Sequence, residues 1–272
     1  MLAIKVGFIG AGRMATALAR GFVRSEIVPS QSILAGDPSA ASRAAFAGDV
    51  PGATIGDDNA AVAANSDVVL LAVKPQQMNE ALAEIHDVLR RDALVVSIAA
   101  GVTLDRLAAG LPDGQRIVRV MPNTPCLIGK GASAYSRGPH ATTEDGQLVA
   151  KLLSSVGAAF DVPETLLDAV TGLSGSGPAF AYSMIEAMAE GGAAAGLPAK
   201  FAVELAARTV AGAAEMVLQT GDPPAVLRER VTSPGGTTQA GLAVLNERGF
   251  REAVVEAVSA ATERSAELGR SN

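Results

Sequence analysis

The sequence contains no tryptophan, and aromatic residues make up only 3% of its 272 residues. Its core must therefore be built from aliphatic side chains, which are plentiful because hydrophobic residues account for 49% of the chain. Cys126 is the only cysteine, so no disulfide bond can form within the chain, and we interpret it as a small core residue rather than a nucleophile. Metal-ligand spacing and a G-x-S-x-G sequence are both missing, which disfavours zinc chemistry and hydrolytic triads.

The chain also lacks an excess of basic residues, since its net charge is −6 and no basic stripe is visible. Binding to nucleic acid or to an anionic membrane surface is therefore disfavoured. No apolar run reaches the length of a transmembrane helix, and the N-terminus lacks a cleavable signal pattern, so we expect a cytoplasmic protein. The length is that of one large domain or two.

A glycine-rich turn near the N-terminus is the first feature with a functional signature. The apolar run 4–9 predicts a buried strand, and residues 13–23 show a helical pattern. Gly10 and Gly12, which lie between them, and Ala15 in the helical segment match the G-x-G-x-x-G/A spacing of a dinucleotide-binding turn. The first glycine permits the turn, the second lets the backbone approach a pyrophosphate, and the alanine lets helix and strand pack closely. A turn without a ligand is the alternative, but the strand–turn–helix context favours a nucleotide at the helix N-terminus.

The residue that follows the second predicted strand bears on the choice of cofactor. This strand covers 32–36 and ends at Asp37, about where an acidic residue would bind a ribose 2′-hydroxyl. Asp37 is equally readable as a turn residue before Pro38. Arg13 and Arg43 could each reach a 2′-phosphate, so the sequence leaves NADH and NADPH both open.

Three further apolar runs, at 67–73, 93–98 and 116–121, alternate with helical patterns. This order predicts an α/β fold, a Rossmann-type doubly wound and mostly parallel sheet covered on both faces. Ligands of such sheets bind beyond the carboxyl ends of the strands. Small or polar residues follow each strand there: Lys74, Ala99-Ala100-Gly101 and Asn123-Thr124.

The pattern changes near Pro163, after which only helical segments are found. We therefore predict a dinucleotide-binding domain at 1–162 and a helical dimerisation and substrate-binding domain at 163–272. The segment 199–218 is apolar nearly all round, so it should be buried on all sides. About a hundred residues can hardly enclose such a helix alone, which favours an intertwined dimer over a monomeric bundle.

Two glycine- and serine-rich stretches interrupt the helical half, at 171–178 and 231–238. We interpret both as loops. The second leads directly into a helix, so its N–H groups and the helix N-terminus suit a carboxylate or a phosphate. A helix N-cap without a ligand is the simpler alternative.

These two stretches, together with the motifs before them, make the chain resemble the pyrroline-5-carboxylate reductase family over essentially its whole length. The motifs that carry the resemblance are GFIGAGRMA at 7–15, LAVKPQ at 71–76, VVSIAAGVT at 95–103, RVMPNTP at 119–125, DAVTGLSGSGPAF at 168–180, VTSPGGTT at 231–238 and GFR at 249–251. The resemblance implies reduction of 1-pyrroline-5-carboxylate to L-proline, the last step of proline biosynthesis. It also implies a Rossmann domain, a C-terminal all-α dimerisation domain, and homodimers that often assemble into decamers.

The resemblance further implies roles for individual residues. NADPH is the expected cofactor by family habit, with NADH possible, because the chain departs from the family pattern at Arg13 and Asp37. Expected cofactor-binding residues are Gly10, Ala11, Gly12, Arg13 and Met14 at the pyrophosphate, Asp37 and Asn59 near the adenosine ribose, Ala72, Val73, Lys74, Pro75, Ala99 and Ala100 along the cleft, and Asn123 with Thr124 near the nicotinamide. Expected substrate-binding residues are Ser233, Gly235, Gly236, Thr237 and Thr238.

We expect the N–H groups of Gly236 and Thr237 to hold the substrate carboxylate, while the Thr238 hydroxyl, as the catalytic group, orients the ring nitrogen. A threonine is too weak an acid to supply the proton on the ring nitrogen. No such donor is needed if the imine binds already protonated. Lys74 is an alternative donor, although a solvated lysine is the simpler interpretation. One alternative is a β-hydroxyacid-type dehydrogenase, which normally needs a lysine in the first helix of its second domain; it is disfavoured because 177–195 contains no lysine. The other is a non-catalytic nucleotide-sensing scaffold, which need not retain a substrate loop; the intact 233–238 loop argues against it.

Overall fold

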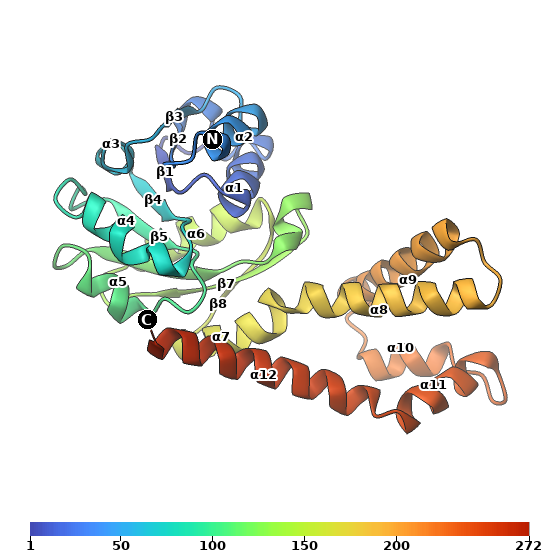
Figure 1. The fold of residues 1–272 in the computed structure, drawn as a ribbon. Coiled ribbons are helices and arrows are strands. Elements are labelled where there is room, and N and C mark those ends of the chain that lie inside the picture. Colours follow the sequence, from blue (N-terminus) through green and yellow to red (C-terminus); the bar gives the residue numbers. More distant parts are fainter. Residues whose placement is uncertain (272) are drawn as a thin grey trace. The chain divides into compact units, whose positions relative to one another are not determined.

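The computed structural model describes residues 1–271, which form two compact units (Figure 1). One unit comprises Met1–Gly175 together with the described residues from Ala260 onward, and the other comprises Ser176–Ser259. No helix in the described chain has both the length and the apolar character needed to cross a membrane.

The first unit is built on an eight-stranded sheet with the strand order β3-β2-β1-β4-β5-β6-β7-β8. All neighbouring strands are parallel except β6 and β7, which are antiparallel. The order reverses at β1, so the carboxyl ends of β1 and β4 flank the point where doubly wound sheets bind ligands. The strands are β1 Val6–Ile9, β2 Ile33–Gly36, β3 Thr54–Gly56, β4 Val68–Leu71, β5 Leu94–Ser97, β6 Arg116–Met121, β7 Gly131–Arg137 and β8 Gly157–Asp161.

Both faces of this sheet are covered by helices, as the apolar runs predicted. On β4, Val68 and Leu70 pack into a core with side chains of α1, α2 and α6, while Val69 and Leu71 pack with α3, α4 and α5. This alternation follows from the two-residue period of a strand. The helices are α1 Arg13–Arg24, α2 Ala40–Asp49, α3 Asn59–Ala64, α4 Met78–Ile85, α5 Leu104–Ala109 and α6 Thr143–Ser154.

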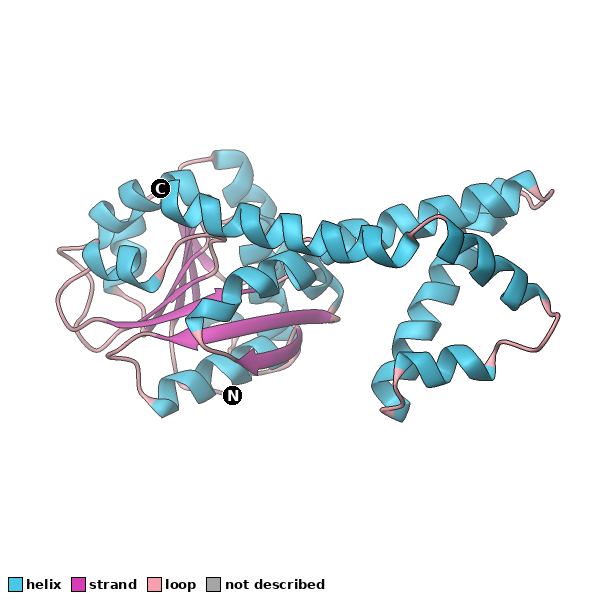
Figure 2. Cartoon of the chain, turned by 90° about the horizontal axis from the view of Figure 1, so that it is seen from below, coloured by secondary structure: helices cyan, strands magenta, loops and turns pink. Residues whose placement is uncertain are grey.

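The second unit is entirely helical (Figure 2) and has almost no core of its own. Among its described apolar residues, only Ala189, Ala202 and Ala206 are buried. Large apolar side chains of α9 are exposed, including Phe201 at 58% and Leu205 at 52%. The predicted burial of this helix on all sides is therefore not provided within one chain. The helices are α8 Gly177–Ala194, α9 Ala199–Thr220, α10 Pro224–Arg230, α11 Thr237–Glu247 and the first part of α12 Phe250–Ser271.

The compact units differ from the predicted division at 162/163 because both ends of the helical half are tied to the sheet. Arg119 in β6 is buried and forms ion pairs with Glu164 at 2.9 Å and Asp168 at 3.7 Å. Ser265 of α12 donates a hydrogen bond of 2.7 Å to Asp168. These contacts place 163–175 and the end of α12 with the sheet, and the boundary at 162/163 stays a prediction about function.

Candidate active site

The glycine turn begins where β1 ends between β2 and β4. The Gly10 N–H donates to the Gly36 carbonyl at 2.7 Å, and the Ala72 N–H donates to the Ile9 carbonyl at 2.8 Å. Gly10 has a φ of +94°, and a Cβ at this position would lie 3.0 Å from the carbonyl carbon and oxygen of Ala72. Only glycine fits a backbone with positive φ this close to another backbone segment.

The N-terminus of α1 presents free donors to open space. The first intrahelical bond runs from Thr16 N–H to the Gly12 carbonyl, so the N–H groups of residues 13–15 have no acceptor within the helix. A Cβ at Gly12 would meet nothing within 4 Å. A pocket of about 490 Å³ opens here, and Ala11, Gly12 and Arg13 line it. Exposed donors at the positive end of a helix fit the pyrophosphate of a dinucleotide.

Asp37 connects the glycine turn to the end of β2. Its carboxylate accepts the Ala11 N–H at 2.9 Å and the Ser39 N–H at 2.8 Å. Arg43 donates to the backbone carbonyls of Asp37 and Pro38 at 2.8 and 3.0 Å. The Asp37 carboxylate therefore stabilises two turns. Because a carboxylate has about four acceptor sites, it can still accept a hydrogen bond from a ribose hydroxyl.

Asn59 opens α3 beside the end of β2, and its side chain is held by a residue that the sequence did not reveal. Its Nδ2 donates to Glu84 of α4 at 2.6 Å. Its Oδ1 is buried, faces Gly36 and has no hydrogen-bond partner among the residues that the structure describes. No motif connects positions 59 and 84, so only the fold could identify Glu84 as the partner.

The remaining predicted cofactor residues follow the carboxyl ends of β4, β5 and β6. Ala99 is buried, and the Lys74 side chain is exposed and forms none of the hydrogen bonds found among the described residues. Asn123 is only 8% exposed, and its side-chain amide is bonded to protein groups on both sides. The residues at this edge are Ala72, Val73, Lys74, Pro75, Ala99, Ala100, Asn123 and Thr124.

In the helical unit, the loop before α11 presents a different set of amides from the expected one. The Gly236 N–H donates to the Ser233 carbonyl at 3.0 Å, and the Gly235 N–H donates to the Gln239 side chain at 2.6 Å. Both glycine amides are therefore engaged within the loop. The N–H groups of Thr237, Thr238 and Gln239 precede the first intrahelical donor, Ala240, and have no acceptor in the helix. The run of N–H groups without an acceptor in the helix therefore begins at Thr237, one residue after the Gly236 amide that we expected to take part.

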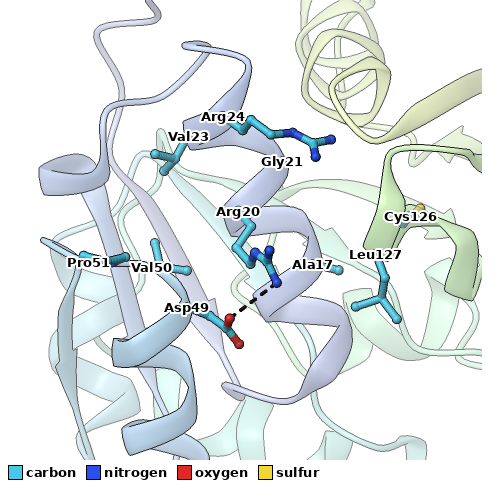
Figure 3. A pocket seen from close by; sticks show the side chains of 10 residues that line it. All are labelled: Ala17, Arg20, Gly21, Val23, Arg24, Asp49, Val50, Pro51, Cys126 and Leu127. Carbon is cyan, nitrogen blue, oxygen red and sulfur yellow. Dashed lines mark hydrogen bonds and ion pairs between the residues drawn. The ribbon is translucent and has the colours of Figure 1, made fainter.

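Figure 3 shows a second cavity, of about 210 Å³, further along α1. Arg20 and Asp49 form an ion pair of 3.4 Å there, and none of the predicted site residues lines it. Cys126 contributes to its wall and is buried, and burial raises the pKa of its thiol. A protonated thiol is a poor nucleophile, which agrees with the interpretation of Cys126 as a core residue.

Comparisons with known proteins cover both halves of the chain. A family model described as pyrroline-5-carboxylate reductase dimerisation matches residues 164–268, and one described as NADP oxidoreductase coenzyme F420-dependent matches residues 5–101. A pyrroline-5-carboxylate reductase of Methanosarcina acetivorans is 45% identical over 98% of each chain. The solved structure of one from Coxiella burnetii has a TM-score of 0.91 at 34% identity, covering 98% of this chain and 99% of that one. A pyrroline carboxylate reductase of Plasmodium falciparum, solved with NADP bound, has a TM-score of 0.89 at 32% identity over 99% of each chain.

Proposed function

The chain belongs to the pyrroline-5-carboxylate reductase family, the NAD(P)H-dependent oxidoreductases of the last step of proline biosynthesis, and we propose which of its residues perform that reaction. The observation that carries the assignment is the pair of free helix N-termini, at Gly12 and at Gly236. The first suits a pyrophosphate, and the second suits the carboxylate of a small substrate.

The proposed cofactor is NADPH, which supplies a hydride when bound. The Plasmodium falciparum relative, solved with NADP, supports this choice. The amides of Gly12, Arg13 and Met14 would hold the pyrophosphate, and Asn59 would face the adenosine ribose. NADH is a second candidate because the Asp37 carboxylate lies at the end of β2, where it would oppose a 2′-phosphate unless Arg13 or Arg43 offsets its charge.

The proposed substrate contacts come from the first turn of α11. The N–H groups of Thr237 and Thr238 would hold the carboxylate, favoured by the positive end of the helix. The Thr238 hydroxyl would hydrogen-bond the ring nitrogen and orient the imine carbon. Gln239 would hold the loop in this form through its bond to the Gly235 N–H. The chain needs no strong acid if the substrate binds as the iminium.

Replacing Thr238 by alanine should lower kcat/KM roughly 5- to 150-fold, because leaving the buried ring nitrogen without its hydrogen-bond partner costs about 1–3 kcal/mol of transition-state stabilisation. Thr238→Ser keeps the hydroxyl and should retain most of the activity. Steady-state kinetics with varied imine would measure both variants. Kinetics of Thr238→Ala equal to those of the parent enzyme would remove Thr238 from the mechanism.

The direct test is proline formation from the imine, with NADPH and NADH compared by kcat/KM. A β-hydroxyacid-type dehydrogenase would oxidise a hydroxy acid instead, and α8 lacks the lysine that such enzymes need. A nucleotide-sensing scaffold would bind NADPH without forming proline. Cofactor binding without turnover would therefore contradict the proposed residue roles.

We also propose that the chain works as a homodimer, with a decamer as a further possibility. The support is the exposed apolar surface of α8 and α9, which lies within the residues matched by the dimerisation model. Burying a leucine or phenylalanine contributes roughly 1.5–3 kcal/mol, so a second copy of this surface would stabilise both chains. The cytoplasmic location stays a prediction from the sequence.

Leu205→Asp should shift the protein from dimer to monomer, because it places a charge where the dimer would bury a 52%-exposed leucine of α9. Multi-angle light scattering over a dilution series would measure the mass. Val88→Asp is the matched control, since it changes an exposed valine of the sheet unit in the same way. A fully dimeric Leu205→Asp protein would place the interface elsewhere.

A further inference from the structure

A closed ring of hydrogen bonds lies at the end of β6, where the nicotinamide is expected. The Asn123 Nδ2 donates to the Ser174 Oγ at 3.1 Å and to the Ser174 carbonyl at 3.2 Å. The Ser174 Oγ donates to the Ala132 carbonyl at 2.9 Å, and the Ala132 N–H donates to the Asn123 Oδ1 at 2.9 Å. Ser174, which is distant in the sequence, is thus joined to the segments around Asn123 and Ala132 through two side chains.

The ring extends the antiparallel pairing of β6 and β7 beyond its last regular pair. Met121 lies opposite Ala134 in the register, so Asn123 lies opposite Ala132. There the Asn123 Oδ1 accepts the Ala132 N–H, and the Ser174 hydroxyl, which accepts from Asn123, donates to the Ala132 carbonyl. Its amide is therefore committed to the protein, and its contribution at this edge is to fix the backbone of 122–124.

Ser174 reaches this ring because the chain forms a π-helical turn at Thr171–Gly175, not the loop that its glycines suggested. Gly175 packs directly against Met121, where a side chain would collide. A π-helical turn is rare and is frequently found at functional sites. Here it places one hydroxyl between a β7 carbonyl and the Asn123 amide.

We propose that Ser174 is a positioning residue for hydride transfer, acting through Asn123 on the segment 122–124. The inference rests on the proposed function, since it takes this edge to be the nicotinamide edge. The glycine turn holds the other end of the cofactor, so loosening the ring should disturb the alignment of the reacting end and hardly change affinity. Displacements of about 1 Å can cost about 100-fold in rate.

The test compares Ser174→Ala, Asn123→Ala and their double variant with the matched control Ser133→Ala. Ser133 lies on β7 beside the ring and is 2% exposed, and the one side-chain hydrogen bond of its hydroxyl among the described residues is to the Cys126 sulfur, at 3.9 Å. Each ring variant should lower kcat roughly 10-fold while the Kd for NADPH changes less than about threefold. The fall in kcat of the double variant should be no more than about twice that of the more affected single variant, because the two side chains act as one unit. Ser174→Thr keeps the hydroxyl and should restore most of the turnover.

Equal kcat values for Ser174→Ala and Ser133→Ala would overturn the proposal, as would single losses that multiply in the double variant. A rise in Kd that matches the fall in kcat would also overturn it, because it would indicate general loosening. The fluorescence of bound NADPH reports on the cofactor's surroundings without requiring turnover. If the parent protein binds NADPH but forms no proline, the assigned reaction fails, and a changed emission in Ser174→Ala but not in Ser133→Ala still supports the positioning role.

Discussion

Gly10→Ala should raise the Kd for NADPH by roughly 10- to 100-fold, which corresponds to the strain of about 1–3 kcal/mol at a positive-φ position that glycine relieves. The added Cβ would lie 3.0 Å from backbone atoms of Ala72, and backbone cannot rotate away as a side chain can. The turn must therefore move, and the donors of residues 13–15 move with it. Titration of NADPH fluorescence would give the Kd, and urea unfolding would give the stability.

The matched control for this variant is Gly48→Ala. Gly48 lies in α2 of the same unit, and a Cβ there would meet nothing within 4 Å. Alanine at such a helical site should stabilise the fold by about 0.5–1 kcal/mol and leave NADPH binding unchanged. If Gly10→Ala bound NADPH as tightly as Gly48→Ala, the glycine turn would not be the pyrophosphate site.

Gly236→Ala should lower kcat/KM by roughly 100-fold, because the loop must move by an amount that misplaces the substrate. A Cβ on Gly236 would collide with the Ser233 hydroxyl and lie 3.1 Å from the Ser233 carbonyl oxygen. That carbonyl accepts the Gly236 N–H, so the turn that starts α11 would open. The Kd for NADPH should stay the same, which distinguishes this variant from Gly10→Ala.

Gly241→Ala, one turn further along α11, is the control for this second variant. Its Cβ would meet nothing within 4 Å of this chain. Its kcat/KM should stay close to that of the parent enzyme, because no group has to move to admit the added methyl. Steady-state kinetics with varied imine would compare the two. Equal kcat/KM values for Gly236→Ala and Gly241→Ala would show that the loop before α11 does not bind the substrate.

Much of the fold could be predicted from the sequence because five strands are apolar runs between helical patterns. The strands β3, β7 and β8 were not predicted. Residues 54–56 are too few for a pattern, and 131–137 and 157–161 are rich in glycine, alanine and serine, which have little intrinsic preference for strands. Pairing with a neighbouring strand places them in the sheet, and that information is not local.

The candidate site was predictable in its motifs but not in its hydrogen bonds. The glycine spacing located both helix N-termini. Which amides stay free depends on Gln239 and Ser233, whose bonds depend on the loop conformation. In the same way, Asn123 reads as a polar residue at a ligand edge, while its bonding to Ser174 depends on an unexpected π-helical turn.

The near absence of a core in the helical unit has a consequence for how this protein should be handled. If the unit becomes stable only when two copies meet, association and folding are one equilibrium, governed by mass action. Its melting temperature should then rise with protein concentration, whereas that of the sheet unit should not. Very dilute samples would carry a loosened helical half that proteases can cut beside an intact nucleotide-binding half.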